Sequence, residues 1–185
     1  MMGKELFDVI RAIKGSGLTQ PEVDAINAAL SGENVMRPSK AITDYVKGIE
    51  KLAKLRPDGK VEAYMPTPND RPTIGYGTTG PDVKMGTVWT VQQAEARFTS
   101  DFSAFAEQVR AAIGAAPTTQ GQFDAMVSLA YNIGETGFRE STLLRLHKEG
   151  KYGEAKAQFA RWNKQAGVVL NGLTKRRAYE AGVYA

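Results

Sequence analysis

The feature of this sequence that most constrains its fold is an apolar repeat between residues 91 and 113. Apolar side chains recur there every three or four residues, the period of an amphipathic α-helix. They are Val91, Ala94, Phe98, Phe102, Phe105, Val109 and Ile113. Thr90 precedes the repeat and is suited to cap the helix. A helix this long needs partners for its apolar face, so we expect further helices packed around it.

The remaining sequence predicts these further helices on both sides of the repeat. Ser39 is suited to cap a helix that Pro57 prevents from continuing beyond about Leu55. The other predicted helices cover residues 4–14 and 19–30, a segment starting at Thr118, and residues 141–149, 152–164 and 173–184. Thr19 and Glu22 have the spacing of a capping box. His147 is expected at a solvated helix end.

The stretch from Pro57 to Gly86 differs from the rest of the chain because turn-forming residues dominate it. It holds prolines at 57, 66, 68, 72 and 81 and glycines at 59, 75, 77, 80 and 86. Two β-prone pieces, residues 61–64 and 73–76, lie between the turns. We therefore predict a small, irregular antiparallel sheet. The fold class is α+β, with a small β-rich lobe joined to a larger helical lobe.

Composition limits the chemistry that this chain can perform. It has no cysteine and one histidine, which excludes disulfides, thiolate metal sites and a cysteine nucleophile. We expect no metal and no cofactor. Carboxyl groups, hydroxyl groups and the backbone remain, and two carboxyl groups without a metal suffice for glycoside hydrolysis.

Charge and hydropathy limit the partners. The net charge of +4 is small, and the predicted helix 19–30 is acidic, which argues against nucleic acid as a partner. The N-terminus mixes acidic with apolar residues, so no signal peptide is predicted. No segment approaches the ~20 apolar residues of a membrane span, so stable membrane insertion is not expected.

Several motifs resemble the phage lysozyme family, glycoside hydrolase family 24. They occur in the family's order over roughly residues 40–185. The first motif, in residues 46–52, is a glutamate at the end of a helix. The second, in residues 63–77, consists of an Ala-Tyr pair, an aspartate and a Thr-Ile-Gly-Tyr-Gly run. Later matches are residues 122–134, 141–144, 159–164 and 172–180. We expect residues 1–38 to form an N-terminal helical extension outside the resemblance and residues 39–185 to form the lysozyme domain. Within that domain the β-rich lobe is expected at about 57–88 and the helical lobe at about 89–185.

The resemblance implies three catalytic residues and a set of substrate contacts. Glu50 is the general acid, Asp70 the second carboxylate and Thr73 the hydroxyl that helps to hold the attacking water. Glu50 also ends a predicted helix, where the negative end of the helix dipole disfavours a charged carboxylate and so favours a proton donor. The expected substrate contacts are Tyr64, Asn132, Gly134 and Arg176. Two of these have alternative interpretations: Gly134 ends a helix, and Arg176 is spaced to pair with Glu180.

The sequence departs from the family pattern at two places. Lys51 stands where the family usually has glycine, and Tyr64 lies 14 residues after Glu50 because of extra residues around 54–59. This insertion makes Asp58 and Glu62 rival acids, although Asp58 suits a turn and Glu62 a solvent-facing strand position. Thr78 stands where many relatives have histidine.

The family resemblance implies an N-acetylmuramidase that hydrolyses the β-1,4 bond between N-acetylmuramic acid and N-acetylglucosamine. Its expected partner is bacterial peptidoglycan, its role that of an endolysin and its state monomeric. It would be made in the host cytoplasm and reach the periplasmic wall once a holin has opened the membrane. The alternatives are a lytic transglycosylase and a non-catalytic wall-binding or virion structural domain.

Overall fold

The computed structural model describes residues 35–68 and 70–185, together with isolated positions at 8, 12, 15, 17–19, 22, 23 and 26. Contacts divide the chain into two units, Met1–Met36 and Arg37–Ala185. The predicted helices at 4–14 and 19–30 lie largely outside the described residues. Within the first unit, the backbone N–H of Thr19 donates to the Glu22 carboxylate over 2.8 Å, which is one half of the predicted capping box.

The second unit begins with α3 (Lys40–Glu50), which ends before the limit that Pro57 sets. Ser39 caps α3 by accepting a hydrogen bond from the Ile42 N–H, as expected. The helix stays within the predicted limit of about Leu55 and ends at Glu50, because Lys51 adopts φ 52° and ψ 152°. This backbone turn leads the chain out of the helix, and Ala53 then donates its N–H to the carbonyl of Gly75.

The β-rich region is small and irregular, as predicted. Strands β1 (Lys60–Glu62) and β2 (Val88–Thr90) pair antiparallel, with Val61 opposite Trp89. Isolated bridges join Tyr64 to Thr73 and Ile74 to Thr78. The side chains of Val61 and Ile74 are fully buried and anchor this region.

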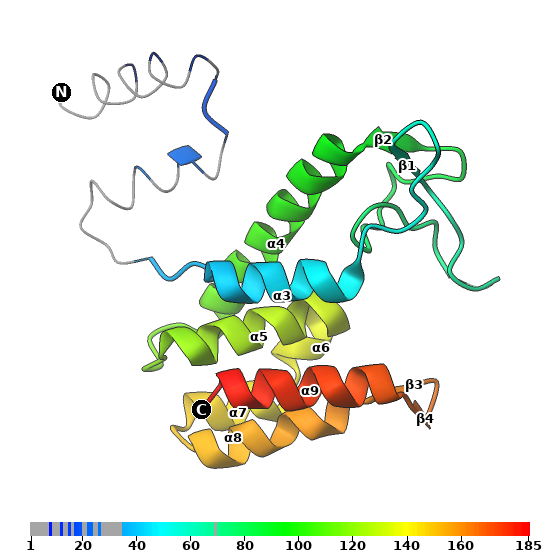
Figure 1. Cartoon of the computed structure of the whole chain (residues 1–185). Coiled ribbons are helices and arrows are strands. Elements are labelled where there is room, and N and C mark those ends of the chain that lie inside the picture. The colour runs from blue at the N-terminus through cyan, green and yellow to red at the C-terminus, as the bar shows by residue number, and fades with distance from the viewer. Residues whose placement is uncertain are drawn as a thin grey trace. The chain divides into compact units, whose positions relative to one another are not determined.

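Helix α4 (Val91–Ile113) joins the β-rich region to the remaining helices (Figure 1). Thr90 and Gln93 form a reciprocal capping box at its start. The predicted apolar face is buried at Ala94, Phe98, Phe102, Ala106, Val109, Ala112 and Ile113. Phe105 is only partly buried, because it faces the cleft described below.

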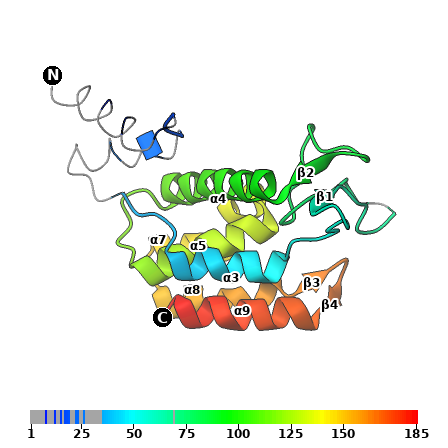
Figure 2. The same ribbon diagram turned by 45° about the horizontal axis from the view of Figure 1, so that its top comes forward.

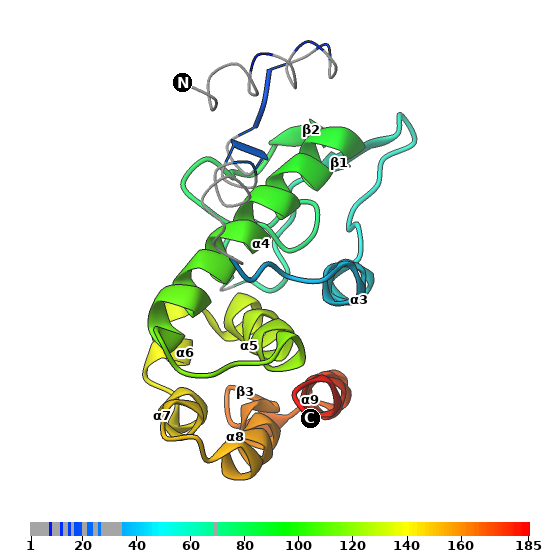
Figure 3. The ribbon, with the colours of Figure 1, turned by 90° about the vertical axis from the view of Figure 1, so that its left-hand side faces the viewer.

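Helix α5 (Gln120–Ile133) forms the centre of the helical lobe, and every residue from 122 to 130 is buried. Its cap is Thr119, one residue after the predicted Thr118. It packs between α4 and the C-terminal α9 (Asn171–Val183), with α3 alongside (Figures 2 and 3).

The remaining elements complete the helical lobe. They are α6 (Glu135–Arg139), α7 (Thr142–Lys148), α8 (Tyr152–Gln158), the 3-10 helix η1 (Phe159–Trp162) and the antiparallel pair β3 (Lys164–Gln165) and β4 (Val168–Val169). In the part of the chain that the structure describes, no helix is long and apolar enough to cross a membrane.

The expectation of a solvated His147 is wrong, because this side chain is fully buried. Its Nε2 lies 2.8 Å from the Thr118 hydroxyl, which itself donates to the carbonyl of Ala116. The histidine must therefore donate through Nε2 and accept at Nδ1 from the hydroxyl of Tyr184, 2.6 Å away. Burial lowers the pKa of His147, so the neutral form fits this network.

Candidate active site

Glu50, the last residue of α3, lines a cleft of about 630 Å³ between the β-rich region and the helical lobe. The other lining residues are Gly77, Thr78, Thr79, Asp101, Ala104, Phe105, Tyr131, Asn132, Ile133 and Gly134. A Cβ at Gly77 would lie 3.0 Å from Oε2 of Glu50, and its φ is 80°. Both the space and the backbone conformation therefore require glycine beside this carboxylate.

Arg176 holds the Glu50 carboxylate from the opposite side. The Nη1 atom of Arg176 donates to Oε1 of Glu50 over 2.8 Å, although the two residues lie 126 positions apart. Arg176 itself is 3% exposed. A buried guanidinium at this distance fixes the position of the carboxylate and stabilises its negative charge.

Arg176 is in turn held by buried groups on α5 and α9. Its Nε donates to Oε1 of Glu180 over 3.1 Å, and its Nη2 donates to the carbonyl of Ser128. Glu180 also accepts from the Ser128 hydroxyl over 2.6 Å and pairs with Arg177. The predicted Arg176–Glu180 pair is therefore confirmed, and it supports the contact with Glu50.

The Glu180 carboxylate is fully buried, and burial raises its pKa while lowering the pKa of Arg177. We take the carboxylate as ionised, because two guanidinium groups surround it and a guanidinium keeps its proton far above neutral pH. The resulting set of alternating charges connects the core of the helical lobe to the cleft.

Asp101 is a second carboxylate in the cleft, which the sequence analysis did not single out. Its Oδ1 accepts from Nε of Arg97 over 2.8 Å, and its Oδ2 accepts from the Thr78 hydroxyl over 3.3 Å. Arg97 also pairs with Asp82, and these hydrogen bonds raise the pKa of Arg97. Thr78 thus contacts the Asp101 carboxylate at the edge of the cleft.

Tyr131 lines the cleft together with the carboxylates of Glu50 and Asp101. Its hydroxyl donates to the carbonyl of Tyr76 over 3.1 Å, and its ring packs edge-on against Phe105. Burial raises the pKa of Tyr131, and the nearby charges of Glu50 and Asp101 raise it further. The tyrosine therefore stays neutral and presents a fixed hydrogen-bonding group.

The two expected substrate contacts on α5 reach the cleft. Asn132 is exposed there, and Gly134 follows it. Gly134 has φ 84°, and its N–H donates to the carbonyl of Ala130, so it also ends the helix. Gly134 therefore ends the helix, as its alternative interpretation predicts, and it also lines the cleft, while its contact with substrate stays a prediction.

Asp70, Thr73 and Tyr64 lie in the β-rich region, outside the set of residues that line the cleft with Glu50. Asp70 is exposed, and its carboxylate accepts from the Thr67 hydroxyl over 2.8 Å. Thr73 is buried and donates its hydroxyl to the carbonyl of Arg71. The structure thus brings Glu50 and Arg176 together with Asn132 and Gly134, and it does not bring Asp70 or Thr73 into this set.

The rival acids Asp58 and Glu62 also lie outside the residues that line the cleft. Asp58 accepts from the N–H of Lys60 within its turn, and Glu62 pairs with Arg56 at the surface. Among the described residues, no three His, Cys, Asp or Glu side chains gather as a metal site would require.

Comparison with known proteins matches this fold and site to one family. Residues 57–180 match the phage lysozyme family. The chain is 41% identical over 150 residues to an endolysin of Bacillus phage PZA, covering 80% of this chain and 55% of that protein. It thus spans about half the length of the curated endolysins that it matches in Bacillus phages PZA and B103.

Two solved structures agree with this match. The endolysin from Escherichia coli O157:H7 phage FAHEc1 is 38% identical, with a TM-score of 0.67, and the match covers 80% of this chain and 93% of that one. The muramidase domain of SpmX from Asticaccaulis excentricus is 32% identical, with a TM-score of 0.68, covering 80% and 97% of the two chains. The lysozyme-like α+β fold is confirmed, and the chain belongs to the phage lysozyme family.

Proposed function

We propose that this chain is an N-acetylmuramidase that hydrolyses the β-1,4 bond between N-acetylmuramic acid and N-acetylglucosamine in peptidoglycan. The observation that carries the proposal is the Glu50 carboxylate, held by Arg176 at the wall of a cleft of about 630 Å³. Family membership and the muramidase domain among the solved neighbours support the same chemistry.

Glu50 acts as the general acid in this proposal. Its proton passes to the leaving oxygen as the bond between that oxygen and the anomeric carbon breaks. A negative carboxylate results, and Arg176 stabilises this charge through the contact already present. Water supplies a hydroxyl group to the anomeric carbon, so the product has a free reducing end.

Asp70 and Thr73 are proposed to accept the proton of this water and to hold its oxygen. Asp101 is the other carboxylate to test, because it lines the same cleft as Glu50. Asp70→Asn should reduce turnover at least about 100-fold if Asp70 is the general base, the range found for general acid–base catalysis. Asp101→Asn should then mainly raise KM. The reverse pattern would assign the base to Asp101.

The central experiment replaces Glu50 by Gln and measures clearing of bacterial cells stripped of their outer membrane. Glu50→Gln keeps the shape of the side chain but removes its proton donor, so we expect clearing to be lost while the far-UV circular dichroism is unchanged. Glu62→Gln and Asp58→Asn are the matched controls, since both carboxylates pair at the surface away from the cleft. Normal clearing by a folded Glu50→Gln protein would refute the proposal.

The products separate this proposal from a lytic transglycosylase. A hydrolase releases free reducing N-acetylmuramic acid ends, whereas a transglycosylase releases 1,6-anhydro ends lighter by one water. We expect reducing ends in mass spectra of digested peptidoglycan. If Asp70 activates water, the anomeric centre should invert. A folded protein that binds the wall without cutting it would instead be the non-catalytic alternative.

The proposed biological role is that of a monomeric endolysin in host-cell lysis, as the names of its relatives suggest. The protein would collect in the host cytoplasm and reach the periplasmic wall after a holin opens the membrane. Several relatives are named SAR-endolysins, so the route of release needs its own test. Expression of this chain alone should leave cells intact until chloroform opens the membrane, and prompt lysis without it would refute holin dependence.

A further inference from the structure

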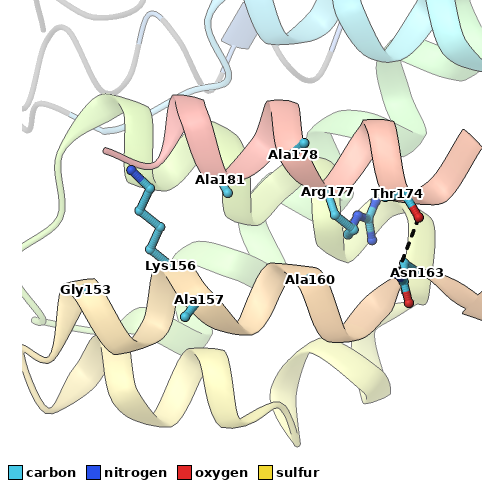
Figure 4. A pocket seen from close by; sticks show the side chains of 9 residues that line it. All are labelled: Gly153, Lys156, Ala157, Ala160, Asn163, Thr174, Arg177, Ala178 and Ala181. Atoms are coloured by element: carbon cyan, nitrogen blue, oxygen red, sulfur yellow. Dashed lines mark hydrogen bonds between the residues drawn. The ribbon is translucent and has the colours of Figure 1, made fainter. Parts of the chain in front are cut away.

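A second hollow, which we call the α8–α9 groove, has a volume of about 470 Å³ (Figure 4). Gly153, Lys156, Ala157, Ala160, Asn163, Thr174, Arg177, Ala178 and Ala181 line it. Five of these nine residues are glycine or alanine. Because neither facing helix carries a large apolar side chain there, the space between α8–η1 and α9 is left open.

Arg177 adds a buried positive charge to a groove that is otherwise lined largely by alanine. The residue is 2% exposed, and its Nη2 donates to Oε1 of Glu180 over 2.9 Å. Its Nη1 is buried and has no hydrogen-bond partner among the described residues. Figure 4 shows its side chain extending from α9 toward Asn163 on the facing segment. A buried guanidinium nitrogen without an acceptor is costly and requires an explanation.

The other polar residues of the groove add positive charge and hydrogen-bonding groups. Lys156 reaches across the groove from α8, and Asn163 and Thr174 contact each other over 3.4 Å at one end (Figure 4). No carboxylate is among the residues that line it. The complementary ligand is an anion attached to a short apolar body. The Nη1 donor of Arg177 that lacks a partner suits an oxygen of a carboxylate.

We propose that the α8–α9 groove binds the carboxylate end of a short peptide of small residues. One carboxylate oxygen would accept from Nη1 of Arg177, and methyl side chains would pack against Ala157 and Ala178. Since Nη1 is covered in the structure, binding requires a small displacement of the side chains around it. The anionic peptide stems of peptidoglycan are the natural source of such an end, an assignment that rests on the proposed function.

The test is a titration of the full chain, labelled with ¹⁵N, with acetyl-alanyl-alanine. We expect saturable amide shifts at Ala157, Thr174 and Ala178. The C-terminal amide of the same peptide should bind at least about tenfold more weakly, because it loses the charge of the carboxylate. Equal binding of acid and amide would overturn the proposal, as would shifts confined to other surfaces or none up to the solubility limit.

Variants test whether the groove itself is the site. Ala178→Leu fills an exposed position in its wall and should abolish the shifts. Ala111→Leu is the matched control, because Ala111 is an exposed helical alanine on α4 outside the groove. Arg177→Lys keeps the charge but removes the Nη1 donor, so a variant shown to be folded should bind about tenfold more weakly or worse. Retained binding in Ala178→Leu would overturn the proposal, and so would shifts that depend only on protein concentration, which would indicate a second copy.

The titration is independent of the muramidase activity. Failure of the peptide to bind leaves hydrolysis of glycan strands by the unmodified chain unaffected and refutes only the groove. An inactive chain that binds the peptide would refute the proposed function and the assignment to peptidoglycan stems, and it would leave the carboxylate site standing.

Discussion

Replacing Lys51 by glycine should stabilise this protein, although the residue directly follows the proposed catalytic acid. Lys51 has φ 52° and ψ 152°, a backbone conformation that essentially only glycine adopts without strain. Its side chain is exposed and forms no ion pair within the described part of the chain. The N–H of Lys51 donates to the carbonyl of Lys47, and glycine keeps this bond.

The size of the effect follows from two opposing contributions. A residue held in such a conformation carries strain of about 1–3 kcal/mol. Glycine gains freedom in the unfolded chain, which costs roughly 0.5–1 kcal/mol. We therefore expect Lys51→Gly to raise the free energy of unfolding by about 0.5–2 kcal/mol, or Tm by roughly 2–6 °C for a chain of this size.

Urea unfolding followed by circular dichroism measures this difference, provided that the m value stays constant. Lys51→Ala is the matched control, because alanine removes the same side chain but keeps the strain. If Lys51→Gly is no more stable than Lys51→Ala, the strain argument is refuted. Clearing of stripped cells by Lys51→Gly then shows whether the strain also serves the position of Glu50.

Three further predictions follow from the described contacts. Gly77→Ala should lower the free energy of unfolding by about 1–3 kcal/mol and reduce clearing. The backbone of Gly77 is left-handed, and the added Cβ would lie 3.0 Å from the Glu50 carboxylate. Unchanged clearing and thermal unfolding would contradict this. Ser128→Ala should lower the free energy of unfolding in urea by about 1–3 kcal/mol, because the buried Glu180 carboxylate loses a hydrogen-bond donor 2.6 Å away. An effect no larger than that of a Ser→Ala change at the surface would contradict this prediction. The free energy of unfolding should fall as pH drops below about 6.5, because the unfolded chain protonates His147 while burial lowers the pKa of His147 in the folded chain. The slope should weaken in His147→Gln, and an unaltered slope would count against this residue as its source.

The sequence predicted the elements that depend on local periodicity and capping. The apolar repeat at 91–113 corresponds to α4, and Ser39 and Thr90 both cap their helices as expected. A small antiparallel sheet was also predicted, but β2 lies outside the two predicted pieces, which meet through an isolated bridge from Tyr64 to Thr73. Pro57 set only an upper limit for the end of α3, and the helix ends before it, at Glu50, where Lys51 adopts φ 52°.

The site was predicted only in part, because its members meet through long-range contacts. Glu50 and Arg176 were named separately, but only the folded chain brings them to 2.8 Å. Asp101 occupies a polar position on α4 that resembles any solvated helical aspartate in the sequence. His147 was misjudged because Tyr184, its buried partner, lies 37 positions away. In each case the decisive neighbour is remote in sequence.

The set of alternating charges formed by Glu50, Arg176, Glu180 and Arg177 restricts how this sequence can evolve. Removing Arg176, Glu180 or Arg177, the three buried members, leaves its neighbours buried with uncompensated charge, at a cost of about 3–5 kcal/mol. Replacing two neighbours together avoids that cost, so a double-mutant cycle on Glu180 and Arg177 should be strongly non-additive. Because Arg176 links Glu50 to the buried residues Glu180 and Arg177, we expect these residues to be substituted in pairs that keep the net charge. Amino-acid substitution at these positions of α9 is therefore limited by the need to keep the charges balanced as well as by packing.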